Sequence, residues 1–224
     1  MVQSNTLSPQ TLSPESRAAA VLAALKARYP LKQPSSHLNA DNPWQLLAAT
    51  ILAAQCTDAR VNAVTPDLFR RWPDPAAIRS ASQSELEEAI RSTGFFRNKA
   101  KSLIGAATAI LRDHKGQVPE SMEKLIRLPG VARKTANCVL WGAFGRNEGL
   151  AVDTHVKRIA FRLGLTAASD PDVVEQDLMR LFPRSEWGGV NHRMVLFGRE
   201  VCAARKPLCA SCGLLAVCPQ CGLK

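Results

Sequence analysis

The sequence predicts an all-α protein. Apolar side chains recur at the three- and four-residue spacing of helices along most of its 224 residues. Capping residues and prolines stand at several positions where such a pattern begins, and no stretch shows the sustained two-residue alternation of a half-buried strand. These observations together indicate about ten short helices and no sheet.

The expected helices follow one another closely. Residues 1–17, rich in Ser, Thr and Pro, are expected to be a flexible tail. Asn42-Pro43 supplies an N-cap and a first-turn proline for the second helix, and Ser82 with Glu85 has the spacing of a capping box. Helices are predicted over residues 17–28, 43–52, 58–72, from 82 onward, 98–114, 121–127, 133–144, 155–163, 171–181 and 190–202.

Positive charge is concentrated in the middle of the chain. Residues 1–90 hold 8 basic and 8 acidic side chains, residues 91–157 hold 12 and 5, and residues 158–224 hold 9 and 6. The middle segment, at 12 − 5 = +7, suits a polyanion such as nucleic acid, because each neutralised phosphate releases counterions. A generic basic surface would explain the charge equally well.

The sequence shows no sign of a membrane or secreted protein. No apolar run approaches the roughly 20 residues that span a bilayer. Residues 1–17 lack the apolar core of a secretory signal, so we expect a cytoplasmic or nucleoid location and no membrane partner. Disulfides are disfavoured there, and a dense group of cysteines in such a compartment indicates a metal site.

The last 23 residues hold five of the seven cysteines. The pattern C-x6-C-x2-C-x5-C is formed by Cys202, Cys209, Cys212 and Cys218. Four thiolates at this spacing can hold a structural zinc or a [4Fe-4S] cluster, and the spacing alone allows both. Cys221 lies outside the pattern, as a free thiol or a substitute ligand. The loop between the first two cysteines presents Arg205 and Lys206, so a metal here would hold a basic loop in place.

The segment Leu125–Leu140 predicts a helical hairpin. A short helix ends at Arg127, Pro129-Gly130 makes a tight turn, and a second helix begins near Arg133. Backbone N–H groups at such a turn bind phosphate without reading base sequence, although an ordinary bundle corner has the same pattern. The segment resembles the helix-hairpin-helix motif of DNA-repair proteins. That motif usually has a second glycine where this chain has Ala132, so a positive φ there would be strained.

Two residues in and after the hairpin suit covalent sugar chemistry. The helix dipole, burial and the neighbouring Arg133 would disfavour a charged ammonium at Lys134, and a neutral amine can attack C1′ of a sugar and form a Schiff base. A plain phosphate-binding lysine is the alternative. Asp153 stands at a helix start, where its ordinary role is an N-cap. Its carboxylate could also help to deprotonate the amine and stabilise positive charge on the sugar.

Leu-Pro-Gly-Val-x-Arg-Lys-Thr-Ala, followed by Val-Asp-Thr-His, resembles the endonuclease III family of DNA glycosylases with lyase activity. The resemblance covers roughly residues 18–221. It implies that Lys134 is the nucleophile, that Asp153 is the catalytic carboxylate and that the four cysteines hold a [4Fe-4S] cluster rather than zinc. It also implies an accessory role for His155 near the site or the DNA backbone. The alternative, a histidine that merely begins a helix, explains this residue equally well.

The same resemblance implies how a base would be extruded. Gln55 matches the family residue that enters the space vacated by the flipped base. Phe95, in the loop over residues 92–99, is the candidate wedge, whereas core packing is the alternative for both Phe95 and Phe96. We expect one of these two rings to be packed and the other exposed. Hairpin contacts to DNA are expected from Gly130, Ala132 and Arg133, and further contacts from Arg205 and Lys206.

Two helical domains flanking a DNA-binding cleft are the implied architecture. Residues 18–35 and 147–224 would form the cluster domain, and residues 36–146 a six-helix barrel that contains the hairpin. The implied activity is removal of oxidised pyrimidines from damaged double-stranded DNA by a monomer, followed by β-elimination 3′ to the abasic site. A monofunctional glycosylase of the same fold, or a non-catalytic DNA-binding metal protein, remains an alternative.

Overall fold

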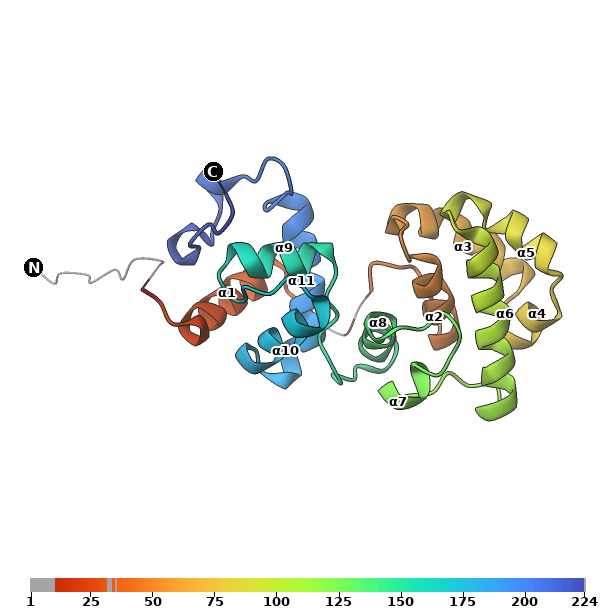
Figure 1. Ribbon diagram of the computed structural model, residues 1–224. Helices are drawn as coiled ribbons and strands as arrows, with labels where there is room; N and C mark the ends of the chain where they lie inside the picture. Colours follow the sequence, from red (N-terminus) through yellow and green to blue (C-terminus); the bar gives the residue numbers. More distant parts are fainter. Residues whose placement is uncertain (1–10, 32–33, 35, 224) are drawn as a thin grey trace, which may run out of the picture. The chain divides into compact units, whose positions relative to one another are not determined.

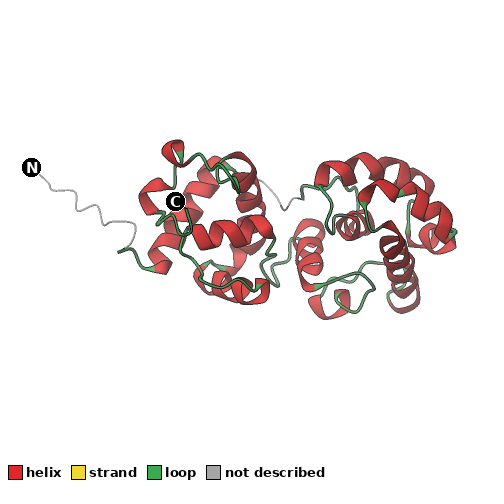
Figure 2. Ribbon diagram, turned by 45° about the horizontal axis from the view of Figure 1, so that its top comes forward, coloured by secondary structure: helices red, strands yellow, loops and turns green. Residues whose placement is uncertain are grey.

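The computed structural model describes residues 11–31, 34 and 36–223, and every regular element in these residues is a helix (Figures 1 and 2). This confirms the predicted all-α class. None of the described helices is long and apolar enough to cross a membrane. The chain forms two compact units with boundaries after Gln33 and Glu148, where the sequence-based expectation is after residues 35 and 146.

We call residues 34–148 the hairpin unit and the described residues of 1–33 and 149–224 the cysteine unit. The elements of the hairpin unit are α2 (Pro43–Leu52), α3 (Asp58–Arg71), α4 (Pro75–Ser80), α5 (Gln83–Ala89), the 3₁₀ helix η1 (Arg91–Thr93), α6 (Phe96–Asp113), α7 (Met122–Leu125) and α8 (Arg133–Phe144). The 18-residue α6 packs against α2, α4 and α5, and α2 also packs against α8. Leu103, Ala107 and Ile110 of α6 are fully buried in this core.

Local capping explains where these helices begin. The side chains of Asn42 and Ser82 accept hydrogen bonds from the amides of Gln45 and Glu85, which confirms both predicted starts. Helix α4 is not among the predicted helices, yet Asp74-Pro75 starts it in the same way: the Asp74 carboxylate accepts from the Ala77 amide at 2.8 Å. A helix of six residues is too short to show a periodic apolar pattern in the sequence.

The cysteine unit contains α1 (Pro14–Arg28), α9 (Thr154–Arg162), α10 (Pro171–Leu181), η2 (Arg184–Glu186), α11 (Trp187–Glu200), η3 (Cys209–Ser211) and η4 (Leu215–Val217). Helix α11 packs against both α1 and α9. Leu25, Ile159 and Met194, one from each of these three helices, are buried in their shared core.

The prediction of a flexible tail through residue 17 was wrong for its last residues. Ser13 caps α1 by accepting from the Ser16 amide at 3.2 Å, and Pro14 occupies the first turn. Arg17 is buried and donates from Nη1 to the Gly164 carbonyl at 3.0 Å, so a tertiary contact holds this turn in place. Residues 1–10 of the predicted tail lie outside the described residues.

A charged network ties α1 to the start of α11. Lys26 Nζ lies 2.5 Å from Glu186 Oε1, and Arg193 Nη1 lies 3.2 Å from Glu186 Oε2. Arg193 is 5% exposed and also donates to the Tyr29 carbonyl. Burial alone would raise the pKa of Glu186, but the hydrogen bonds and charges of Lys26 and Arg193 outweigh it and lower the pKa.

We predict that Glu186→Gln destabilises the cysteine unit at neutral pH by about 1–3 kcal/mol, because two charge-assisted hydrogen bonds lose their acceptor charge. The folded-state pKa of Glu186 is lowered, so its stabilisation is fully present above the ordinary value of 4.5 and is lost as the pH falls through the folded value. Hydrogen exchange of α1 and α11 amides is measured between pH 3 and 7. The difference in protection between wild type and variant should disappear as the pH falls.

Asp67→Asn is the matched control. Asp67 pairs with Arg70 on α3, and both side chains are more than three-quarters exposed, at 77% and 76%. Such a pair contributes about 0–1 kcal/mol, so this variant should melt like wild type at every pH. Two results would contradict the role assigned to Glu186. One is an equal loss of stability in the two variants, and the other is a loss of stability in Glu186→Gln that persists in acid.

Candidate functional site

The hairpin turn sits directly on α6. A Cβ atom added to Gly130 would lie 2.5 Å from Ser102 Cβ, and one added to Gly105 would lie 3.0 Å from Pro129 Cβ. Gly130 has φ +77°, a conformation that glycine adopts without strain. Both the close approach to Ser102 and the left-handed backbone therefore require glycine at position 130.

The expected strain at Ala132 is absent. Ala132 has φ −86° and ψ 170°, an ordinary extended conformation, so a positive φ is needed at Gly130 but not at Ala132. This corrects the concern that alanine in place of the second glycine distorts the turn. Ala132 is also the N-cap of α8 and makes no side-chain cap hydrogen bond. The first turn of α8 consequently offers its backbone N–H groups without a capping side chain in the way.

Lys134 lies in the first turn of α8 and is exposed, so the expectation that it is buried is wrong. Arg133, immediately before it, is half-buried. The first turn places both cations at the positive end of the helix dipole, where a cation is disfavoured. An exposed amine at this position is accessible to a sugar bound at the hairpin.

Asp153 is the N-cap of α9. Its Oδ1 accepts hydrogen bonds from the amides of His155 and Val156, each at 2.8 Å, and its Oδ2 lies 3.4 Å from His155 Nδ1. One carboxylate oxygen is thus committed to the cap, and the side chain remains 24% exposed. The His155 ring also packs on α11, where a Cβ added to Gly198 would lie 2.8 Å from its Cδ2. Lys134 belongs to the hairpin unit, whereas Asp153 and His155 belong to the cysteine unit.

Gln55 and Phe95 project from tight left-handed turns. Gln55 has φ 52° and follows the end of α2, and Phe95 has φ 47° and precedes α6. Both are exposed, Phe95 to 64%, which is unusual for a phenylalanine. Phe96 packs against the core of the hairpin unit, so one ring of the pair is packed and one is exposed, as expected.

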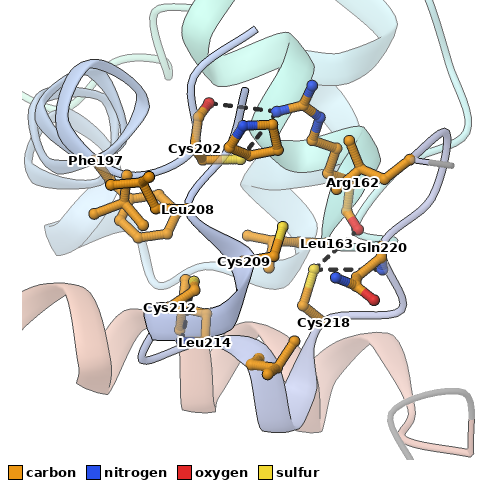
Figure 3. Close-up of a pocket in the computed structure, with 14 residues that line it drawn as sticks. Arg162, Leu163, Phe197, Cys202, Leu208, Cys209, Cys212, Leu214, Cys218 and Gln220 are labelled. Carbon is orange, nitrogen blue, oxygen red and sulfur yellow. Dashed lines mark hydrogen bonds between the residues drawn. The ribbon is translucent and has the colours of Figure 1, made fainter. Parts of the chain in front are cut away.

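Four cysteines surround one cavity in the cysteine unit (Figure 3). The lining cysteines are Cys202, Cys209, Cys212 and Cys218, the four of the spacing pattern. The cavity opens partly to solvent. None of the seven cysteines forms a disulfide. Cys221 is not among the lining residues, and its amide instead donates to the Arg162 carbonyl at 3.1 Å.

The four cysteines line the cavity without meeting at one point. Among the described residues, no three His, Cys, Asp or Glu side chains converge closely enough to ligate a single metal ion. Burial raises the pKa of Cys212 and of Cys218, and the neighbouring thiolates raise both further. The amides of Leu214 and Gln220 donate to the sulfurs of Cys212 and Cys218, each at 3.4 Å. The four thiols could hold a metal group once they are deprotonated.

Arg162, which the sequence did not single out, holds the cysteine loop. Its guanidinium donates to Cys202 Sγ at 3.3 Å, to the Ala203 carbonyl at 2.7 Å and to the Ala204 carbonyl at 2.8 Å (Figure 3 shows its bond to the Cys202 sulfur). The adjoining Arg205 and Lys206 are exposed. Arg162 is buried, with 8% of its surface exposed, and no pattern in the sequence indicates this role.

Known proteins are similar to this chain over most of its length. A family model of the HhH-GPD superfamily of base excision DNA repair proteins matches residues 48–184. The chain is 53% identical over 208 residues to endonuclease III of Synechocystis sp., covering 93% of this chain and 94% of that protein. It is 36% identical over 198 residues to endonuclease III of Escherichia coli K12, covering 88% and 92%.

Solved structures give the same result. A non-covalent endonuclease III–DNA complex is 40% identical, with a TM-score of 0.87 over 94% of this chain and 97% of that one. A trapped covalent endonuclease III–DNA intermediate has a TM-score of 0.86 at the same identity and coverage. The chain therefore belongs to the endonuclease III family, a family of base excision repair enzymes that are DNA glycosylases and AP lyases.

Proposed function

We propose that the chain removes oxidised pyrimidines from damaged double-stranded DNA and then cleaves the strand 3′ to the abasic site. It would act as a monomer on nucleoid DNA in the cytoplasm. The observation that carries this proposal is the exposed amine of Lys134 in the first turn of α8, directly after a phosphate-binding type of turn.

The hairpin would anchor the DNA backbone. Gly130 lets the hairpin turn pack closely on α6, and the first turn of α8 offers N–H donors at the positive end of its dipole. Arg133 would add a charged contact, and Arg205 and Lys206 would contribute from the cysteine loop. These contacts fix the register of the strand and do not distinguish one base from another.

Gln55 and Phe95 would support base extrusion. The exposed ring of Phe95 can wedge into the base stack, and the Gln55 amide can pair with the base left opposite the gap. Left-handed backbone at both residues points to function, because the conformation costs roughly 1–3 kcal/mol per non-glycine residue.

Lys134 would carry out the chemistry. Its Nζ attacks C1′ and displaces the base, which leaves with the bonding electrons and takes up a proton. Loss of the second amine proton and opening of the sugar ring give an imine between Nζ and C1′. Removal of a C2′ proton then expels the 3′ phosphate, and water hydrolyses the imine to regenerate the amine. Asp153 would help to deprotonate Lys134 and stabilise positive charge on the sugar, with His155 hydrogen-bonded beside it.

The four lining cysteines would hold a [4Fe-4S] cluster. Four thiols line one cavity, a ligand set that a [4Fe-4S] cluster or zinc accepts, and membership of the endonuclease III family favours the cluster. All four positions around the iron atoms would be occupied by protein, so the cluster would supply structural support for the basic loop rather than hydrolytic chemistry.

We predict that Lys134→Gln abolishes the covalent adduct that borohydride traps on duplex DNA carrying an oxidised pyrimidine. Glutamine keeps a polar side chain of similar size but cannot form an imine. The trapped complex is measured by its shift on a denaturing gel.

Asp153→Asn is the matched variant for the carboxylate. Asparagine caps a helix as well as aspartate, so α9 should stay folded while the charge is lost. Adduct should still form, at a rate reduced by about tenfold or more. An undiminished adduct from Lys134→Gln would overturn the assignment, and release of free base without any adduct from the wild type would indicate a monofunctional glycosylase.

We predict that Gly130→Ala weakens DNA binding by at least about tenfold, because the new Cβ meets Ser102 at 2.5 Å in a left-handed conformation and must displace the turn. Fluorescence anisotropy with a duplex containing an abasic-site analogue measures the affinity. Gly116→Ala is the control: it introduces the same kind of strain at φ +80°, but its nearest neighbour lies 3.8 Å away and it is not at the hairpin. Unchanged affinity of Gly130→Ala would argue against the hairpin as the anchor.

We predict that Cys209→Ser lowers bound iron and acid-labile sulfide to a small fraction of the wild-type content, together with the visible absorbance, because one ligand to the cluster is lost. Cys221→Ser should keep both, since Cys221 does not line the cavity. Purified protein that contains zinc and no iron, by elemental analysis, would overturn the cluster assignment in favour of a zinc site.

A further inference from the structure

Lys99 is a buried lysine that takes no part in the steps described above. It lies near the start of α6 and is 5% exposed. Its Nζ donates to the Thr93 carbonyl at 2.7 Å, back across the turn that carries Phe95. Buried lysines are rare unless they are paired, so the burial of Lys99 needs an explanation.

The contact closes a short loop around Phe95. Thr93 is 2% exposed, and its hydroxyl donates to the Ile90 carbonyl at 2.8 Å. Gly94 and Phe95 follow with φ of 70° and 47°. The Lys99 amide then donates to the Phe95 carbonyl at 3.1 Å. Lys99 therefore holds the chain on both sides of Phe95, through its side chain before the ring and through its backbone after it.

The position of Lys99 is not one that stability alone would favour. Burial lowers the pKa of Lys99. The start of α6 is also the positive end of a helix dipole, which repels a cation. An apolar side chain of similar length would avoid both costs. The ammonium is therefore best explained by the shape that it gives to the loop.

We propose that Lys99 is a positioning residue that holds the Phe95 turn in the shape that base extrusion requires. This inference rests on the proposed function, because it concerns how that turn enters DNA. Lys99 would not touch the reacting atoms. Its loss should slow removal of a paired lesion and spare the chemistry at a site that needs no extrusion.

The test compares Lys99→Met with Lys101→Met, which removes one exposed charge two residues further along the same helix. Two substrates are used: a duplex carrying an oxidised pyrimidine beside a 2-aminopurine, and a single-stranded oligonucleotide carrying a preformed abasic site. Single-turnover base removal and 2-aminopurine fluorescence report extrusion on the duplex. Borohydride trapping on the single strand reports imine formation alone.

For Lys99→Met we expect duplex base removal to fall about tenfold or more, with loss of the 2-aminopurine signal. Trapping on the single-stranded abasic site should stay within about twofold of wild type, and the Tm within a few degrees. Lys101→Met should stay within about twofold in every assay. Lys99→Arg, which keeps a cation and donors, should recover at least half of the lost duplex rate.

Several outcomes would overturn the inference. Duplex removal by Lys99→Met within twofold of wild type would show that the contact is dispensable. An equal loss on both substrates, or a variant that does not fold, would make Lys99 a stability residue. Wild-type protein that traps on neither substrate would instead refute the proposed lysine chemistry, and the 2-aminopurine signal would still test Lys99 separately.

Discussion

The packing of the hairpin turn onto α6 is the contact on which the proposed DNA-binding surface of residues 34–148 depends. Ser102 and Gly105 of α6 leave room for Pro129 and Gly130 and for nothing larger. The same helix begins at the Phe95 turn, which Lys99 closes. It also packs on α2, whose end carries Gln55. The 18-residue α6 therefore sets the positions of Phe95 and of the hairpin turn. Through the hairpin it also sets the start of α8, which carries Lys134.

Helix α9 has the corresponding place in the cysteine unit. Asp153 caps one end of this nine-residue helix, and Arg162 at the other end grips Cys202 and the two carbonyls that follow it. Arg158, between them, donates to the carbonyls of Cys202 and Gly198. The carboxylate and the cysteine loop are thus fixed to opposite ends of one element.

Sequence could predict features that are local, and it missed those that depend on distant contacts. Asn42-Pro43, Pro129-Gly130 and the four-cysteine spacing each specify their geometry within a few residues. Arg162 and Lys99 escaped because their partners are the carbonyls of loops, which no side-chain pattern reveals. Ala132 was misjudged because analogy with the motif suggested a second residue with positive φ. In the structure Gly130 has φ +77° and Ala132 has φ −86°, so of these two positions only Gly130 requires glycine.

The residues that break local rules coincide with the proposed working parts. A buried ammonium at Lys99, cations in the first turn of α8, a 64% exposed phenylalanine in a left-handed turn and four thiols facing one cavity are each unfavourable on their own. Such features persist only where the surroundings over-determine them. Here the apolar cores of the two units, built from fully buried side chains such as Leu103 and Ile159, supply that support. The stability of each core and the strain of each functional turn are therefore two aspects of one arrangement: a loosely packed α6 could not hold Phe95 in a conformation that its own backbone disfavours.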